Sequence, residues 1–145
     1  MTSIRDLPTP QAVIFDLDGT LVDTVERRID GWLAVFEEVG IPADRERLAP
    51  LIGVDGKRLA REIAALAGQV LDDQRAEAID KRAGEIYEHL NRSPRALPGV
   101  RELVDAIEAK RIPWSIATSS RKDQVMTSVK ALDLRADPTI VDASH

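Results

Sequence analysis

Val13-Ile14-Phe15-Asp16-Leu17-Asp18-Gly19-Thr20-Leu21-Val22-Asp23-Thr24 is the stretch that decides the fold. The apolar run from Ala12 to Phe15, which covers the start of this stretch, predicts a strand buried on both faces, as in parallel sheets. Asp16 then falls at the carboxyl end of the strand, where open α/β sheets bind their ligands. In extended backbone the side chains of Asp16 and Asp18 point the same way. Because two close carboxylates repel each other, the pair indicates either a Mg²⁺ site or a division of acid and base roles.

The composition limits the classes of protein to which the chain can belong. Its 145 residues are 43% hydrophobic and 31% charged, with a net charge of −5. That balance is typical of a globular domain, and the negative charge argues against a nucleic-acid partner, since nucleic-acid binding needs a basic surface. The absence of cysteine excludes disulfides and thiolate metal sites. Residues 1–10 lack the apolar core of a signal peptide and no apolar run spans a membrane, so we expect a cytoplasmic protein without a membrane partner.

The hydrophobic pattern predicts the order of helices and strands. Apolar residues spaced by three and four predict a helix over 25–39, and Gly and Pro residues mark most of the boundaries that follow. The remaining expected elements are helices over 45–51, 56–67, 72–90, 99–110 and 122–131, and strands over 114–117 and 139–142. This order predicts an α/β fold with a parallel sheet.

The expected elements also suggest a domain division. The all-helical stretch between Thr24 and Arg95 is too long for one crossover connection, so it is interpreted as an insertion. The Pro-containing segment 93–99 marks its end. We therefore assign residues 1–23 and 96–145 to an α/β core and residues 24–95 to an inserted helical domain.

A second group of polar residues follows the strand at 114–117. Trp114-Ser115-Ile116-Ala117-Thr118-Ser119-Ser120 ends in three consecutive hydroxyls, just before a helix that begins near Lys122. Hydroxyls and free amides at a helix N-terminus favour anion binding. Ser and Thr are also the preferred helix caps, so taken alone such a stretch is more often a helix cap than a binding site. Its position after a strand of the same sheet as Asp16 favours anion binding.

The segment Asp16–Thr24 resembles the first motif of the haloacid dehalogenase-like hydrolases, in the branch of the phosphoglycolate phosphatases and β-phosphoglucomutases. The resemblance implies a Rossmann-like core with a helical cap and a small phosphorylated metabolite as substrate. It further implies that Asp16 is the nucleophile of an aspartyl-phosphate intermediate and that Asp18 is the general acid and base. Mg²⁺ would be held by the Asp16 carboxylate and the Asp18 backbone carbonyl. Dehalogenases of the family lack the second aspartate, so Asp18 favours phosphate chemistry.

Two further segments resemble parts of the same family. Thr118 matches the residue of the second motif that binds the transferring phosphoryl group, with the Ser119 amide as a helper, and Ser120 and Arg121 as weaker candidates for substrate contact. Leu51-Ile52-Gly53-Val54-Asp55-Gly56-Lys57 resembles the substrate-specificity loop of the cap, which makes Gly53 and Lys57 candidates. A turn role for Gly53 and a solvated surface for Lys57 are the alternatives. The sugar-phosphate mutases of the family carry basic residues at the positions of Ile52 and Gly56, so these two residues argue against a mutase function.

The family pattern also contains a lysine and an acidic pair that this sequence does not reach. Strands that flank the first strand on its other side are expected beyond residue 145 as well. The 145 residues should therefore have little activity and should expose the edge of the first strand, which favours self-association. Two interpretations stay open: a fragment of an active phosphatase, or a short protein that binds phosphate or a partner without catalysis.

Overall fold

The computed structural model describes residues 8–142, and its elements follow the predicted order. They are β1 (Val13–Phe15), α1 (Val25–Val39), α2 (Arg45–Leu48), the 3-10 turn η2 (Ala49–Leu51), α3 (Gly56–Leu66), α4 (Asp73–Leu90), α5 (Val100–Ala109), β2 (Trp114–Ala117), α6 (Lys122–Ala131) and β3 (Thr139–Val141). The helix predicted over 45–51 is divided into α2 and η2. Pro50 explains the division, because it has no amide hydrogen for the next α-helical bond. The expectation of no signal peptide concerns residues 1–10, most of which lie outside the described residues.

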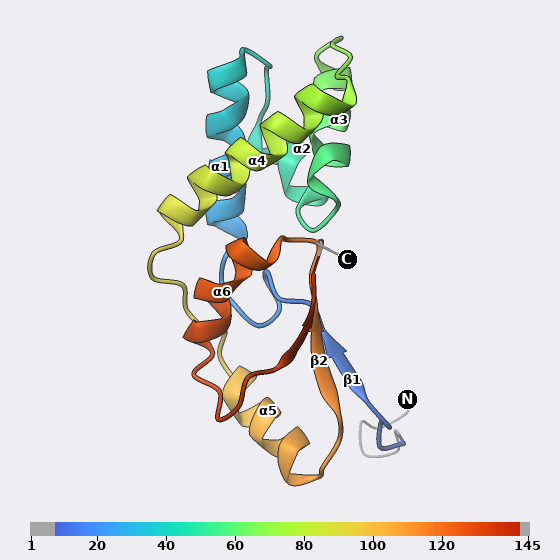
Figure 1. The fold of residues 1–145 in the computed structure, drawn as a ribbon, viewed down its shortest axis with the longest axis vertical. Coiled ribbons are helices and arrows are strands. Elements are labelled where there is room, and N and C mark those ends of the chain that lie inside the picture. The colour runs from blue at the N-terminus through green and yellow to red at the C-terminus, as the bar shows by residue number, and fades with distance from the viewer. Residues whose placement is uncertain (1–7, 143–145) are drawn as a thin grey trace.

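The three strands form one parallel sheet in the order β1-β2-β3. Phe15 lies beside Ile116, which in turn lies beside Ile140, so these three side chains share one face. In Figure 1 the carboxyl ends of the strands point toward the layer formed by helices α1 to α4. The α/β architecture with a parallel sheet is therefore confirmed.

Only one face of this sheet is covered, so the prediction of a first strand buried on both faces is wrong for the described residues. Phe15 and Ile116 pack with residues of α5 and α6 in one hydrophobic cluster. On the opposite face the side chains of Ile14 and Val141 are 71% and 52% exposed. The reason is visible in Figure 1, where α5 and α6 lie on the same side of the sheet. Self-association through the open edge of β1 stays a prediction.

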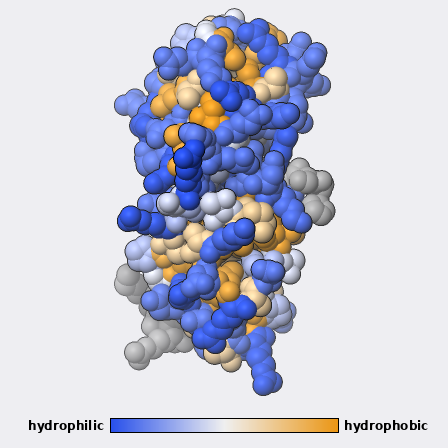
Figure 2. All heavy atoms as spheres, turned by 60° about the vertical axis from the view of Figure 1, so that its left-hand side comes forward, coloured by the Kyte–Doolittle hydropathy of each residue, from blue (hydrophilic) through white to orange (hydrophobic). Residues whose placement is uncertain are grey.

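The apolar residues gather in two clusters, which position the site between them. One cluster joins α1, α2, α3 and α4 around Phe36, Leu48 and Ile63, and the other joins the sheet to α5 and α6 around Leu17 and Ile116. Figure 2 shows a mostly hydrophilic surface over the helical layer, with more hydrophobic residues exposed in the lower half. The proposed domain limits at residues 23/24 and 95/96 remain a prediction. Between residues 8 and 142, no helix is both long and apolar enough to cross a bilayer.

Candidate active site

The turn that follows β1 is built by its own backbone. The carbonyl of Leu17 accepts hydrogen bonds from the amides of Thr20, Leu21 and Val22, and the Gly19 amide donates to the Val22 carbonyl at 2.8 Å. Leu17, Leu21 and Val22 are all buried, which anchors the turn in the core. Burial of these apolar residues therefore fixes the position of the backbone that carries the two aspartates.

Gly19 fits this turn for two separate reasons. Its φ of +73° lies in the left-handed region, and a Cβ at this position would come within 2.6 Å of Val25 Cγ2. Gly68 has the same φ of +73° but nothing within 4 Å of a Cβ. A comparison of the two glycines can therefore distinguish the energetic cost of the left-handed conformation from that of the close contact with Val25.

Gly19→Ala should lower the free energy of unfolding more than Gly68→Ala does. The left-handed conformation costs an L-residue about 1–2 kcal/mol in both variants, and only Gly19→Ala adds a clash with α1. Chemical denaturation of both variants measures the difference. Equal losses of stability would show that the turn yields to the extra methyl group without cost.

The two aspartates lie in different surroundings, which their spacing does not predict. Asp16 is exposed, and its Oδ1 accepts a hydrogen bond from the Leu17 amide at 2.9 Å. The side chain of Asp18 is only 8% exposed. Its Oδ1 accepts a hydrogen bond from the Thr24 hydroxyl, and its Oδ2 accepts one from Ser120 Oγ at 3.3 Å. Asp16 is accessible to a ligand, whereas Asp18 is held by neighbouring side chains.

Arg28 of α1 completes the surroundings of Asp18. Its Nη2 lies 3.1 Å from Asp18 Oδ2, and its guanidinium lies 3.8 Å from the centre of the Tyr87 ring. The side chain is only 12% exposed, so Arg28 does not belong to a solvated face of α1. A charge that leaves water needs an opposite charge, and Asp18 provides it. Burial also raises the pKa of the Tyr87 hydroxyl, while Arg28 opposes that shift.

A buried polar group extends this contact from the helical layer to α6. The side-chain amide of Asn91 donates hydrogen bonds to the Tyr87 hydroxyl at 2.8 Å and to Ser128 Oγ at 2.9 Å. Tyr87 and Asn91 belong to α4 and its C-cap, whereas Ser128 lies on α6. Polar groups buried in this way constrain the orientation of the elements that carry them.

The end of β2 brings hydroxyls next to Asp18, although not in the predicted arrangement. Thr118 donates its amide to the Val141 carbonyl, and its Oγ1 accepts the Ser120 amide at 3.2 Å. The side chain that contacts Asp18 is Ser120, which is 8% exposed. Ser119 is exposed. The N-cap residue of α6 is Arg121, and among the described residues its side chain makes no capping hydrogen bond.

A cavity of about 40 Å³ lies between this site and the helical layer. Of the predicted site residues, it is lined by Asp18, Gly53, Ser119 and Ser120, while Asp16 and Thr118 do not line it. The other residues that line it are Arg28, Trp32, Ile52, Val54, Gly56, Leu59, Asp80 and Gln124. Gly53 therefore lies at the cavity, which is where a residue of a substrate-specificity loop would lie.

Lys57 and Arg121 do not line this cavity, because both basic side chains contact acidic residues of α4. Lys57 Nζ lies 3.6 Å from Glu77 Oε2. Arg121 forms an ion pair with Glu77 and another, at 3.2 Å, with Asp80. The contacts of Arg121 connect the N-terminus of α6 to the helical layer. Both basic side chains, which were candidates for substrate contact, thus form ion pairs within the protein.

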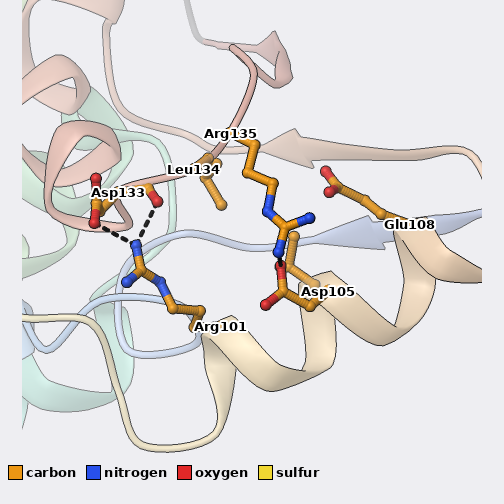
Figure 3. Close-up of a pocket in the computed structure, with 7 residues that line it drawn as sticks. Arg101, Asp105, Glu108, Asp133, Leu134 and Arg135 are labelled. Carbon is orange, nitrogen blue, oxygen red and sulfur yellow. Dashed lines mark hydrogen bonds and ion pairs between the residues drawn. The ribbon is translucent and has the colours of Figure 1, made fainter.

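A larger hollow of about 390 Å³ lies elsewhere, between α5 and the turn after α6 (Figure 3). Four of its charged residues form ion pairs, Arg101 with Asp133 and Arg135 with Asp105. None of the predicted site residues lines it. Size alone therefore does not identify the functional site in this protein.

The donor set around Asp16 fits a Mg²⁺ ion only in part. Asp16 is exposed and offers carboxylate oxygens, but residues 8–142 hold no group of three or more His, Cys, Asp or Glu side chains arranged to bind a metal. Mg²⁺ typically uses one or two carboxylates and completes its shell with water and substrate phosphate. Such a shell is compatible with Asp16, whereas an all-protein site is not.

Sequence reasoning missed four residues that lie around Asp18 or line the cavity: Thr24, Arg28, Asp80 and Gln124. Thr24 was part of the quoted motif, but nothing in its spacing indicated a bond to Asp18. Arg28 precedes Trp32 by four residues, which places both on one face of a helix. That signal could have suggested a buried guanidinium, whereas Asp80 and Gln124 had no local signal.

Comparisons with known proteins identify the family to which the chain belongs. A family model described as haloacid dehalogenase-like hydrolase matches residues 13–141. Validoxylamine A 7'-phosphate phosphatase of Streptomyces hygroscopicus subsp. limoneus is 29% identical over 130 residues, covering 86% of this chain and 58% of that protein. β-Phosphoglucomutase of Bacillus subtilis (strain 168) is 31% identical over 116 residues, covering 77% of this chain and 51% of that protein.

A solved structure agrees over most of the chain. The crystal structure of a hydrolase from Pseudomonas syringae is 31% identical, with a TM-score of 0.85, and the match covers 92% of this chain and 61% of that one. The chain thus spans about half the length of the curated relatives it matches. With the family match across nearly all described residues, the chain belongs to the haloacid dehalogenase-like hydrolases.

Proposed function

We propose that this protein is part of a Mg²⁺-dependent phosphatase that hydrolyses a small phosphomonoester through a phosphoaspartyl intermediate on Asp16. The observation that carries the proposal is the hydrogen bond from Ser120 Oγ to Asp18 Oδ2. It joins residues 102 positions apart, which follow the carboxyl ends of the paired strands β1 and β2. In open α/β sheets this is where ligands bind.

The proposed reaction uses the two aspartates in sequence. A carboxylate oxygen of Asp16 attacks the phosphorus atom, and the bond from phosphorus to the leaving oxygen breaks. Asp18 gives a proton to that oxygen. Water then attacks the phosphoaspartyl group, Asp18 takes a proton from the water, and the bond from phosphorus to Asp16 breaks to release inorganic phosphate. The exposure of Asp16 and the fixed position of Asp18 support this division of roles.

Two groups of this chain would hold the phosphate and its counter-ion. The Asp16 carboxylate would bind Mg²⁺, which offsets the negative charge of the phosphoryl group. Thr118 and the Ser119 amide, at the start of the segment that leads into α6, would bind phosphate oxygens. The match of Thr118 to the phosphate-binding residue of the second motif supports its role.

The relatives support phosphate-ester chemistry in general. One of them is a phosphatase by name and another is a phosphomutase. The cavity favours hydrolysis over a mutase reaction, which must hold a second phosphate. Ile52 and Gly56 line it at the positions where mutases carry basic residues, and Lys57 and Arg121 are paired with acidic side chains.

The proposal is tested by trapping the intermediate in the protein extended to the length of its relatives. Acid quenching during turnover of p-nitrophenyl phosphate with Mg²⁺, followed by mass spectrometry, should find the phosphoryl group on the peptide that contains Asp16. The same experiment without Mg²⁺ is the control. Phosphate binding without any release of p-nitrophenol would favour the non-catalytic alternative, and a phosphoryl group on another peptide would remove Asp16 from its role.

A further inference from the structure

We infer that Asp80, Gln124 and Trp32 form a subsite that selects a short, uncharged, hydroxyl-bearing leaving group. This inference rests on the phosphatase function proposed above. The three residues come from α4, α6 and α1, so the subsite exists only when the helical layer and the core are assembled.

The three side chains share their position relative to the catalytic aspartate. All of them line the 40 Å³ cavity that Asp18 and Ser120 also line. All of them also line a smaller adjoining cavity of about 20 Å³, together with Arg28 and Tyr87. A group that leaves the phosphorus next to Asp18 would therefore extend toward these three residues.

Two glycines make room for the polar walls of the subsite. A Cβ on Gly56 would come within 1.9 Å of Asp80 Oδ1, and a Cβ on Gly84 would come within 2.0 Å of Gln124 Nε2. Any larger residue at either position would displace the carboxylate or the amide. The two glycines thus leave space beside the cavity for the Asp80 carboxylate and the Gln124 side-chain amide.

The charges around the cavity disfavour a second anionic group on the substrate. The charged residues that line the cavity are two carboxylates, Asp18 and Asp80, and one guanidinium, Arg28, whose Nη2 lies 3.1 Å from Asp18 Oδ2. A carboxylate or second phosphate entering here would meet more negative than positive charge.

The same groups suit hydroxyls, and the volume suits a small group. A carboxylate accepts hydrogen bonds from hydroxyls, and an amide both donates and accepts them. Trp32, which is 7% exposed, supplies an apolar wall. One water needs about 10–15 Å³ of such volume, so the 40 Å³ cavity has room for about three waters. A leaving group with two or three heavy atoms in the cavity matches this space.

The test compares two phosphate esters that differ by one heavy atom, 2-hydroxyethyl phosphate and 2-phosphoglycolate, of which the first carries a hydroxymethyl group where the second carries a carboxylate. Isothermal titration with Mg²⁺ gives the Kd of each ester for the 145-residue chain. We expect about tenfold tighter binding of 2-hydroxyethyl phosphate. Asp80→Asn should reduce this ratio to near one, and Gln124→Glu should increase it, because the two changes alter the charge of the subsite in opposite directions.

Glu85→Gln is the matched control, since Glu85 is an exposed residue of α4 that pairs with Arg82 and does not line the cavity. It should leave the ratio unchanged. Binding of both esters with a ratio that Asp80→Asn and Gln124→Glu do not move would overturn the subsite and leave the phosphatase proposal standing. Binding of neither ester would overturn the subsite in this chain, whereas the phosphatase proposal is decided separately by trapping the phosphoryl group on the Asp16 peptide.

Discussion

Replacing Asp16 by Asn is expected to reduce phosphate release by about 10⁵-fold or more, because the amide lacks the charged oxygen that attacks phosphorus. Loss of a nucleophile costs about 10⁶-fold in a well-studied hydrolase. Asp16 is exposed and its Oδ1 accepts one backbone amide, so the fold should tolerate the change. The measurement is kcat with p-nitrophenyl phosphate and Mg²⁺ in the protein extended to the length of its relatives.

Asp23→Asn is the control for this experiment. Asp23 is an exposed aspartate in the same segment, and its backbone amide, which the substitution keeps, donates to the Arg95 carbonyl. The variant should retain most of the activity. Turnover by Asp16→Asn within tenfold of the parent protein, with both variants folded, would assign the nucleophile to another group.

Removing Asp18 should lower both the rate and the stability. General acid and base groups typically contribute about 10²–10⁴-fold to a rate, and Asp18→Ala should lose that factor. The structure adds a second effect, because Arg28 would be left buried without its partner. Breaking a buried ion pair on one side costs about 3 kcal/mol. Chemical denaturation and kcat of the same variant measure the two effects separately.

A double substitution separates the ion pair from other causes of instability. Asp18→Asn together with Arg28→Gln removes both charges and should lose less stability than the sum of the two single changes. The rate should remain low, since the acid and base group is still missing. Additive losses of stability would show that Asp18 and Arg28 are not energetically coupled, despite the 3.1 Å between them.

The contact between Asp18 and Arg28 also connects the helical layer to the reaction centre. Arg28 lies on α1 and stacks on Tyr87 of α4, and both helices belong to the layer above the sheet. The orientation of the proposed acid and base therefore depends on where this layer lies. Substitutions in α1 should consequently affect the rate as well as substrate binding.

The sequence by itself determined the order and type of the elements and the two strand ends that carry the candidate site. Helical and strand periodicity is local, so the pattern around Phe36 in α1 predicts an amphipathic helix without knowledge of its partners. The aspartates after β1 and the hydroxyls after β2 were found in the same way, because a parallel sheet aligns the carboxyl ends of its strands.

Only the tertiary structure decided which side chains meet. Ser120 contacts Asp18, whereas Thr118 was the predicted phosphate ligand, and no local pattern distinguishes neighbouring hydroxyls. Arg28 is buried against Asp18, and Lys57 and Arg121 face acidic residues of α4. The surroundings of a charged side chain depend on residues far away in the sequence. Spacing alone therefore cannot separate a buried ion pair from a solvated surface.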